Sequence, residues 1–134
     1  MNVIVIPMLW GKSDNWCYYI YTDDIKDGIY VDIAEADKIT QFQKDFGIEG
    51  TPVKHLLSTH HHWDHTGGNK DIAAANPEVV ITAGVEDNVD CCTQPVVDKQ
   101  TFDLFNGKVA MKCIHTPCHT RGHICYYLEC DTEG

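Results

Sequence analysis

The sequence predicts one α/β domain built from packed layers of strands and helices. Two observations lead to this prediction. Short segments rich in apolar, β-branched and aromatic residues alternate with segments of helical periodicity. The two segments with the greatest density of chemically reactive side chains, residues 59–65 and 116–122, each follow a predicted strand. This placement is typical of α/β folds, which commonly bind ligands at the ends of strands.

The first half of the chain is predicted to contain four strands and two helices. The strands are rich in β-branched and aromatic residues and are bounded by polar or glycine-containing turns: residues 3–6, 16–21, 29–32 and 54–59. Between the last two strands, apolar residues recur at helical spacing across residues 34–46, and Gly47 provides a stop. A second helix is expected from Gly67 to Ala75, before Pro77.

The second half of the chain is predicted to consist mainly of strands. Three are expected, at residues 79–82, 109–115 and 123–128. Residues 84–107 give no clear pattern apart from a loop at Asn106-Gly107. No repeat, low-complexity segment or linker interrupts the sequence, so residues 1–134 are expected to form a single domain.

The composition is typical of a soluble globular protein. With 134 residues, of which 43% are hydrophobic and 22% charged, the chain can form one domain with its own core. No apolar run reaches the roughly 20 residues that cross a bilayer, so a membrane is not expected as a partner. The first residues resemble neither a secretory signal nor a transit peptide. The cytoplasm is therefore the expected location.

Charge argues against a nucleic-acid-binding protein, and cysteine content argues against a disulfide-bonded one. The net charge of −10 disfavours nucleic acid as a partner, because phosphates require clustered Lys and Arg. An anionic substrate would need local positive charge, part of which bound metal cations would supply. The seven cysteines are odd in number and include the adjacent pair Cys91 and Cys92. In a chain without an export signal, they are expected to be free thiols.

The strongest indication of function is a run of potential metal ligands directly after a predicted strand: His60, His61, His62, Asp64 and His65. Imidazole is the commonest protein ligand for zinc, and carboxylates accompany it in catalytic sites. In extended backbone, His60 and His62 project to the same side and can share an ion, while His61 points away. Asp64 and His65 lie where a turn would aim them at a second ion, about 3.5–4 Å from the first. A solvated, histidine-rich surface loop is the alternative interpretation.

A third nitrogen for the first ion is expected from the segment TPCHTRGH. A catalytic zinc site needs three protein ligands and an open position for water. His119 lies in a loop after a strand and is expected to complete the set with His60 and His62. His123 is the alternative, although it begins the next strand and is expected to hold the loop by hydrogen bonding. 

Other reactive side chains are expected to have structural roles. His55 and His115 lie within or at the end of predicted strands. Cys118 is a weak candidate for a nucleophile, because adjacent residues rarely point at each other and no Asn or Asp is evident to orient His119 as its base. As a metal ligand, the Cys118 thiolate would occupy the position that hydrolysis leaves open for water.

These motifs resemble those of a known family. The segment from His60 to His65 matches the HxHxDH signature of the metallo-β-lactamase superfamily. The longer string STHHHWDHTGGN resembles the form found in glyoxalase II (hydroxyacylglutathione hydrolase), and TPCHTRGHICYYL is similar to the second block of that family. The opening segments VIVIPMLW, DNWCYYI and YVD are similar to its first strands. The resemblance therefore covers nearly the whole chain.

The resemblance implies a fold, a metal centre and a reaction. The family fold is a four-layer αββα sandwich that holds two divalent metal ions, with Zn, Fe or Mn as the candidates. His60, His62 and His119 would bind the first ion, while Asp64 and His65 would bind the second. Asp64 is therefore also expected to be a catalytic residue. The implied reaction is hydrolysis of the thioester S-D-lactoylglutathione, in which activated water attacks the carbonyl to give glutathione and D-lactate.

The sequence departs from the family pattern after the second block. The family has a bridging aspartate at the end of a GDTLF-like strand and a later histidine ligand, and neither has a counterpart here. Asp131 lies only 12 residues after His119 and lacks the apolar strand that separates the turn from the aspartate in the family, so it is not expected to be the bridge. The residues and the helical domain that contact glutathione also have no counterpart, so the substrate-binding residues stay unknown. The chain is expected to correspond to the N-terminal part of the family, as an incomplete sandwich with an exposed edge and apolar patch.

We therefore expect a metal-dependent thioester hydrolase of the glyoxalase II type, impaired in this short form. Loss of a bridging ligand would remove several kcal/mol of transition-state stabilisation. One alternative is a non-catalytic metal-binding fragment, which the missing bridge favours. The other is a different enzyme on the same fold, such as a persulfide dioxygenase or a lactonase, whose motifs normally differ around Trp63 or His119.

Overall fold

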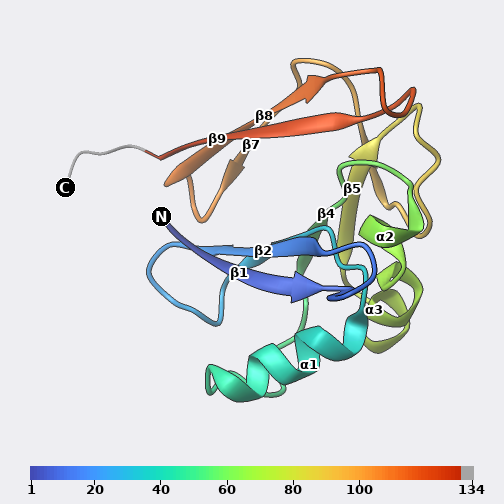
Figure 1. The fold of residues 1–134 in the computed structure, drawn as a ribbon. Coiled ribbons are helices and arrows are strands. Elements are labelled where there is room, and N and C mark those ends of the chain that lie inside the picture. Colours follow the sequence, from blue (N-terminus) through green and yellow to red (C-terminus); the bar gives the residue numbers. More distant parts are fainter. Residues whose placement is uncertain (131–134) are drawn as a thin grey trace.

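Two β-sheets face one another, and helices cover the outer side of the larger sheet (Figure 1). The structure is a computed structural model that describes residues 1–130. Within these residues, three of the four layers of an αββα sandwich are present, in the order helices, six-stranded sheet and three-stranded sheet. The predicted α/β class and the incomplete sandwich are confirmed.

The larger sheet changes from antiparallel to parallel pairing partway across. Its strands lie in chain order: β1 (Asn2–Met8), β2 (Asn15–Tyr21), β3 (Ile29–Val31), β4 (His55–Leu57), β5 (Val80–Gly84) and β6 (Gln94–Val96). The first three strands pair antiparallel, whereas β3 to β6 pair in parallel. Parallel neighbours end at the same edge of a sheet. The segments that follow β3, β4 and β5 therefore emerge close together.

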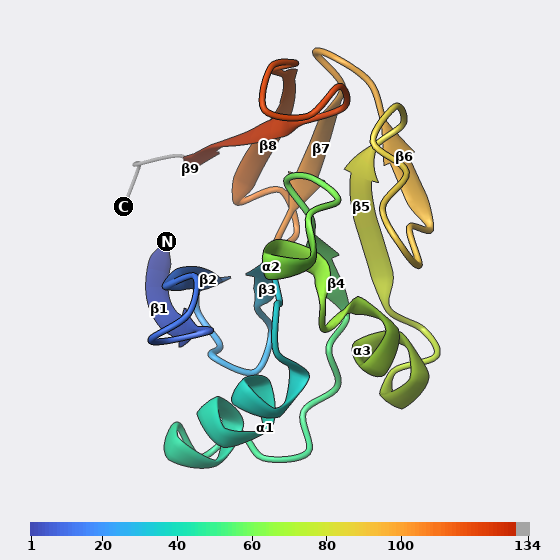
Figure 2. The same cartoon turned by 45° about the vertical axis from the view of Figure 1, so that its right-hand side comes forward.

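The remaining elements form the two outer layers. The helices are α1 (Ala36–Asp45), α2 (Trp63–Thr66) and α3 (Asn69–Ala75), and they connect the parallel strands β3, β4 and β5. The smaller sheet is antiparallel and consists of β7 (Thr101–Leu104), β8 (Val109–His115) and β9 (Ile124–Cys130). Figure 2 shows α1 and α3 on one side of the larger sheet and β7–β9 on the other.

Two hydrophobic clusters hold the layers together. The cluster beneath the helices includes Ile39, Phe42, Ile72, Met8, Tyr19 and Leu56. The cluster between the sheets includes Ile20, Leu57, Val96, Met111, Cys113 and Ile124. The neighbours Leu56 and Leu57 belong to different clusters because successive side chains of a strand point to opposite faces. Burial of each large side chain contributes about 1.5–3 kcal/mol, so both faces of β4 anchor the segment that follows it.

The predicted elements agree with the structure except in two places. Residues 84–107, where the sequence gives no clear pattern, contain β6 and β7. The strand β6 has only three residues and includes Pro95, which removes the usual signals of a strand. The single turn α2 lies inside the histidine motif, where the sequence suggested only a turn. No helix among residues 1–130 has the length and apolar character needed to cross a membrane.

One side of the sandwich is open. Both β1 and β9 are outer strands of their sheets within the described residues. On β1 and β2, Val3, Val5, Trp16 and Tyr18 are each 40% or more exposed. A groove lined by apolar residues of β1, β2 and β9 ends at Thr59 and His123. The exposed edge and apolar patch expected from the sequence are thus present.

Candidate metal centre

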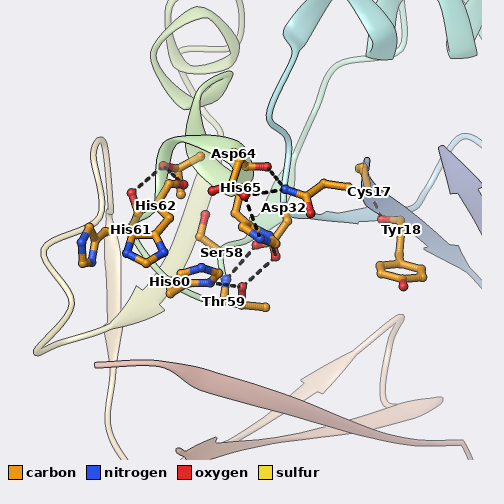
Figure 3. A network of polar contacts seen from close by, with 12 residues as sticks. Cys17, Tyr18, Asp32, Ser58, Thr59, His60, His61, His62, Asp64 and His65 are labelled. Atoms are coloured by element: carbon orange, nitrogen blue, oxygen red, sulfur yellow. Dashed lines mark hydrogen bonds and ion pairs between the residues drawn. The ribbon is translucent and has the colours of Figure 1, made fainter. Parts of the chain in front are cut away.

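His60 is fixed by a chain of hydrogen bonds that leaves one of its nitrogens bare. The Thr59 hydroxyl donates to Asp32 Oδ2 at 2.7 Å, so it can only accept from His60 Nδ1, which lies 2.9 Å away (Figure 3). The proton of the neutral ring is therefore on Nδ1, and the lone pair is on Nε2. This Nε2 atom is buried and has no hydrogen-bond partner. A buried nitrogen of this kind is a candidate metal ligand, since an unpaired buried polar atom is otherwise costly.

Two further imidazoles converge on the same place. His62 Nδ1 lies 3.0 Å from His119 Nε2, although the two residues come from different loops. The ring of His60 is 4.9 Å from the rings of both His62 and His119, centre to centre. One nitrogen from each of the three residues lies within 4.8 Å of the others. Tetrahedral zinc with nitrogen ligands at 2.0–2.1 Å requires separations of about 3.3–3.4 Å. The three imidazoles fit a cation after small adjustments.

Asp64 and His65 lie beside this trio and face one another. His65 Nδ1 donates to Asp32 Oδ2 at 2.9 Å, which turns His65 Nε2 toward Asp64 Oδ2, 3.8 Å away. The Asn15 side-chain amide donates to Asp64 Oδ2 at 2.9 Å and to the Asp64 carbonyl at 2.7 Å. A nitrogen and a carboxylate oxygen are thus held in one place, and both are suited to a divalent cation.

Asp32 is one of the residues at this site that the sequence did not identify. It is buried, directly follows β3, and accepts hydrogen bonds from Thr59 N, Thr59 Oγ1 and His65 Nδ1. Its backbone has a φ of 56°, a left-handed conformation that Asp tolerates better than most residues. Asp32, His60 and His65 also place ligand atoms within 4.8 Å of one another. Because Asp32 Oδ2 already accepts two hydrogen bonds, we assign it to orienting the histidines rather than to binding a cation.

Electrostatics favour the form that binds a cation at His60 and Asp64, and oppose it at His65. Burial, reinforced by the neighbouring His65, lowers the pKa of His60 to about 4, so the ring is neutral as a ligand must be. The hydrogen bond to Asp32 raises the pKa of His65. Partial burial pushes the pKa of Asp64 upward, but the Asn15 hydrogen bond and the nearby histidines outweigh it, and the pKa lies below its ordinary value.

The second loop contains the other histidines that the sequence singled out. His123 Nδ1 lies 2.9 Å from Thr116 Oγ1, and its ring is 5.1 Å from that of His60. His115 Nε2 donates to the Arg121 carbonyl at 2.8 Å. Both contacts are internal to the loop between β8 and β9. They are the kind of contact expected of histidines that support the loop rather than bind a cation.

Three other expectations can be compared with the structure. The His61 ring is 4.8 Å from the His62 ring, centre to centre, but it is not part of the trio and its Nδ1 contacts Asp87 at 3.2 Å instead. Cys17 and Cys113 are free thiols, one in each hydrophobic cluster. Asp131, considered as a bridging carboxylate, lies outside the described residues.

Comparison with known proteins supports the resemblance found in the motifs. Residues 31–90 match the model of the Metallo-beta-lactamase superfamily. The cytoplasmic hydroxyacylglutathione hydrolase of Arabidopsis thaliana is 34% identical over 129 residues, which are 96% of this chain and 47% of that protein. A probable hydroxyacylglutathione hydrolase of Schizosaccharomyces pombe, glo2, is 34% identical over 96% of this chain and 50% of that protein. Both relatives are named as hydrolases, and the resemblance predicted from the sequence is confirmed.

The fold is also shared with solved structures. The native FEZ-1 metallo-beta-lactamase of Legionella gormanii superimposes with a TM-score of 0.77 at 20% identity, covering 99% of this chain and 57% of that one. The chain spans about half the length of the curated relatives that it matches. Together with the cluster of His60, His62 and His119, the superfamily match indicates a metal-binding site.

Proposed function

We propose that this chain, which matches the metallo-β-lactamase superfamily and the hydroxyacylglutathione hydrolases, binds a divalent cation through His60, His62 and His119 and hydrolyses a glutathione thioester. The observation that carries the proposal is the convergence of three imidazoles whose donor atoms face a common point, one of them a buried nitrogen without a partner. We propose zinc as the first candidate, since three nitrogen ligands with an open position suit it. Iron and manganese are the alternatives.

The chain's own residues would prepare the site for hydrolysis. A cation at this position would polarise the carbonyl of the substrate and acidify a water molecule to a pKa of about 7. The chain of hydrogen bonds through Thr59 and Asp32 would keep the His60 lone pair aimed at the cation. The same carboxylate would fix the orientation of His65. The thiol released from a thioester has an ordinary pKa of about 8.5, so the site needs no residue to protonate the leaving group.

A second cation would be held less firmly. Asp64 Oδ2 and His65 Nε2 are the donors that we assign to it. Two donors are fewer than the three that hold the first cation, so we expect weak occupancy and slow turnover. A loss of several kcal/mol of transition-state stabilisation corresponds to roughly a thousandfold in rate or more.

Zinc binding and thioester hydrolysis are measured on the same preparation to test the proposal. The metal-free chain is titrated with Zn²⁺ against a chelator, and thiol release from S-D-lactoylglutathione is then followed beside a lactone, a β-lactam and a persulfide. We expect zinc binding and thiol release, and a loss of zinc affinity of more than roughly 100-fold in His119→Ala, since even residues that only orient ligands change affinity 10–100-fold. The control is His55→Ala, which removes an exposed imidazole in β4 and should leave the affinity unchanged.

The outcomes separate the competing interpretations. Zinc binding without turnover of the thioester would favour a non-catalytic metal-binding protein. Turnover of the lactone or the persulfide alone would favour another enzyme of the same fold. Failure of the wild-type chain to bind zinc, or equal affinity in His119→Ala, would contradict the proposed site.

A further inference from the structure

Asp87 lies between the two loops that carry the candidate ligands. It follows β5, in a turn outside both histidine motifs, and its side chain is 1% exposed. Its Oδ2 accepts from the backbone N–H of His61 at 2.6 Å, and its Oδ1 accepts from the backbone N–H of Gly122 at 3.1 Å. One buried carboxylate therefore binds the backbones of both loops.

The second loop presses directly against this turn. A Cβ atom at Gly122 would lie 2.3 Å from the Asp87 backbone nitrogen, and a Cβ atom at Gly84 would lie 2.1 Å from the Gly122 carbonyl oxygen. Both distances are too short for any side chain, so glycine is required at each position for the loops to approach this closely. The contact fixes the loop three residues beyond His119.

The first loop is held by Asp87 at a residue between two of the candidate ligands. His61 lies between His60 and His62, and its N–H is the donor to Asp87. The His61 ring adds a second contact to the same carboxylate, at 3.2 Å. Besides Asp87, two contacts join the segments in this region: the backbone hydrogen bond from Ile124 to the Thr59 carbonyl, 2.9 Å long, and the contact between His62 Nδ1 and His119 Nε2, 3.0 Å long.

The charge of Asp87 suits this role. Burial alone would raise its pKa, but the nearby Thr120 hydroxyl, the His61 ring and the two backbone amides outweigh burial and bring the pKa below its ordinary value. A carboxylate can accept from both amides at once, whereas an amide side chain has only one accepting oxygen.

We propose that Asp87 is a positioning residue that sets the distance between His119 and the pair His60 and His62, and so determines the affinity of the site for its cation. This inference rests on the proposed metal centre and deepens it. The carboxylate is not among the groups whose ligand atoms cluster at the site. It acts by holding His61 and Gly122, one on each loop.

Zinc affinity in Asp87→Asn tests the proposal. The variant keeps the volume of the side chain but can no longer accept from both amides, and we expect zinc affinity to fall 10–100-fold, the range found when residues that orient ligands are replaced. Co²⁺ is used as a second probe, because its visible spectrum reports the geometry of its ligands, and we expect the spectrum to change. Glu86→Gln is the matched control, since it removes one charge from an exposed neighbour in the same turn.

A second control separates positioning from general destabilisation. Asn76→Ala breaks two hydrogen bonds at the end of α3, to Val53 and Ile72, neither of which belongs to either motif. It should lower the thermal midpoint and leave zinc affinity unchanged. All affinities are measured at a temperature where each variant is folded. Equal zinc affinity in folded Asp87→Asn and wild type would overturn the inference, whereas absence of zinc binding in wild type would overturn the proposed function instead.

A measurement on the wild-type chain covers the case in which Asp87→Asn does not fold. In the metal-free protein, the amide hydrogens of His61 and Gly122 should exchange with solvent much more slowly than those of exposed loops, because Asp87 already holds both. Exchange as fast as that of an exposed loop would overturn the inference, since no preformed clamp would then exist.

Discussion

The substitution Asp32→Asn tests the hydrogen-bond network that orients two of the candidate ligands. Asp32 accepts from Thr59 N at 2.8 Å, from Thr59 Oγ1 at 2.7 Å and from His65 Nδ1 at 2.9 Å. Asparagine has the same shape and tolerates the left-handed backbone at φ 56°, so the backbone should be preserved. With the amide oxygen kept on Thr59 N, however, the NH₂ group takes the place of Oδ2 and can accept from neither Thr59 Oγ1 nor His65 Nδ1.

The effect on the histidines follows from the direction of each hydrogen bond. An NH₂ group facing His65 Nδ1 favours the tautomer with its proton on Nε2, which removes the lone pair that faces Asp64. The Thr59 hydroxyl, no longer donating to a carboxylate, can donate to His60 Nδ1 and shift that proton to Nε2 as well. Both shifts protonate a nitrogen that we assign to a cation, and we expect affinity to fall about 10–100-fold, or about 1.4–2.7 kcal/mol.

Stability should fall by a comparable amount. A hydrogen bond to a charged group contributes about 1.5–3 kcal/mol, and Asp32→Asn loses at least one of them. Zinc affinity is measured by chelator competition, and the free energy of unfolding by urea denaturation. Asp103→Asn provides the control, since it removes the same charge from an exposed position on β7. Zinc affinity within twofold of wild type in folded Asp32→Asn would refute the orienting role of Asp32.

Two further predictions concern packing and pH. In Gly122→Ala, the added methyl group would lie 2.3 Å from the Asp87 backbone nitrogen, and we expect the free energy of unfolding to fall by about 1–3 kcal/mol; no change in urea denaturation would contradict the tight contact. In the metal-free chain, the pKa of His60 is about 4 when the protein is folded, whereas an ordinary histidine, as in the unfolded chain, has a pKa of 6.5. As the pH falls, the unfolded chain therefore takes up this proton first. The free energy of unfolding should therefore decline between pH 6.5 and 4, and decline less steeply in His60→Gln; parallel slopes in the two proteins would disprove it.

The sequence predicted the parts of the site that depend on local backbone geometry. Alternation in an extended segment predicted His60 and His62 on one side and His61 on the other; donor atoms of His60 and His62 lie near one another, and the His61 ring contacts Asp87. His119 was expected beside them because it lies in a loop after a strand, and its Nε2 lies 3.0 Å from His62 Nδ1. These positions could be predicted because each histidine lies within a few residues of the end of a strand, where the backbone direction is still set by that strand.

Residues that orient the ligands could not be found in the same way. Asp32 and Asp87 meet the motifs only because β3, β4 and β5 pair in parallel and end at one edge. Asn15 reaches Asp64 because β2 begins at this edge and runs antiparallel to β3. In a sequence with 20 acidic residues, no local pattern distinguishes these two aspartates from the others. A signal did exist for Asp32, because it ends the predicted strand 29–32 as Thr59 ends the strand 54–59.

The open side of the sandwich has a consequence for how the molecule behaves in solution. Within the described residues, β1 and β9 are edge strands, and Val3, Val5 and Trp16 are exposed on β1 and β2. A strand of a neighbouring molecule can pair with an edge strand of this kind. Mutual repulsion between molecules of net charge −10 opposes such growth. Salt shortens the range of that repulsion to about 10 Å at 0.1 M and about 3 Å at 1 M. We therefore expect self-association of this chain to increase with ionic strength.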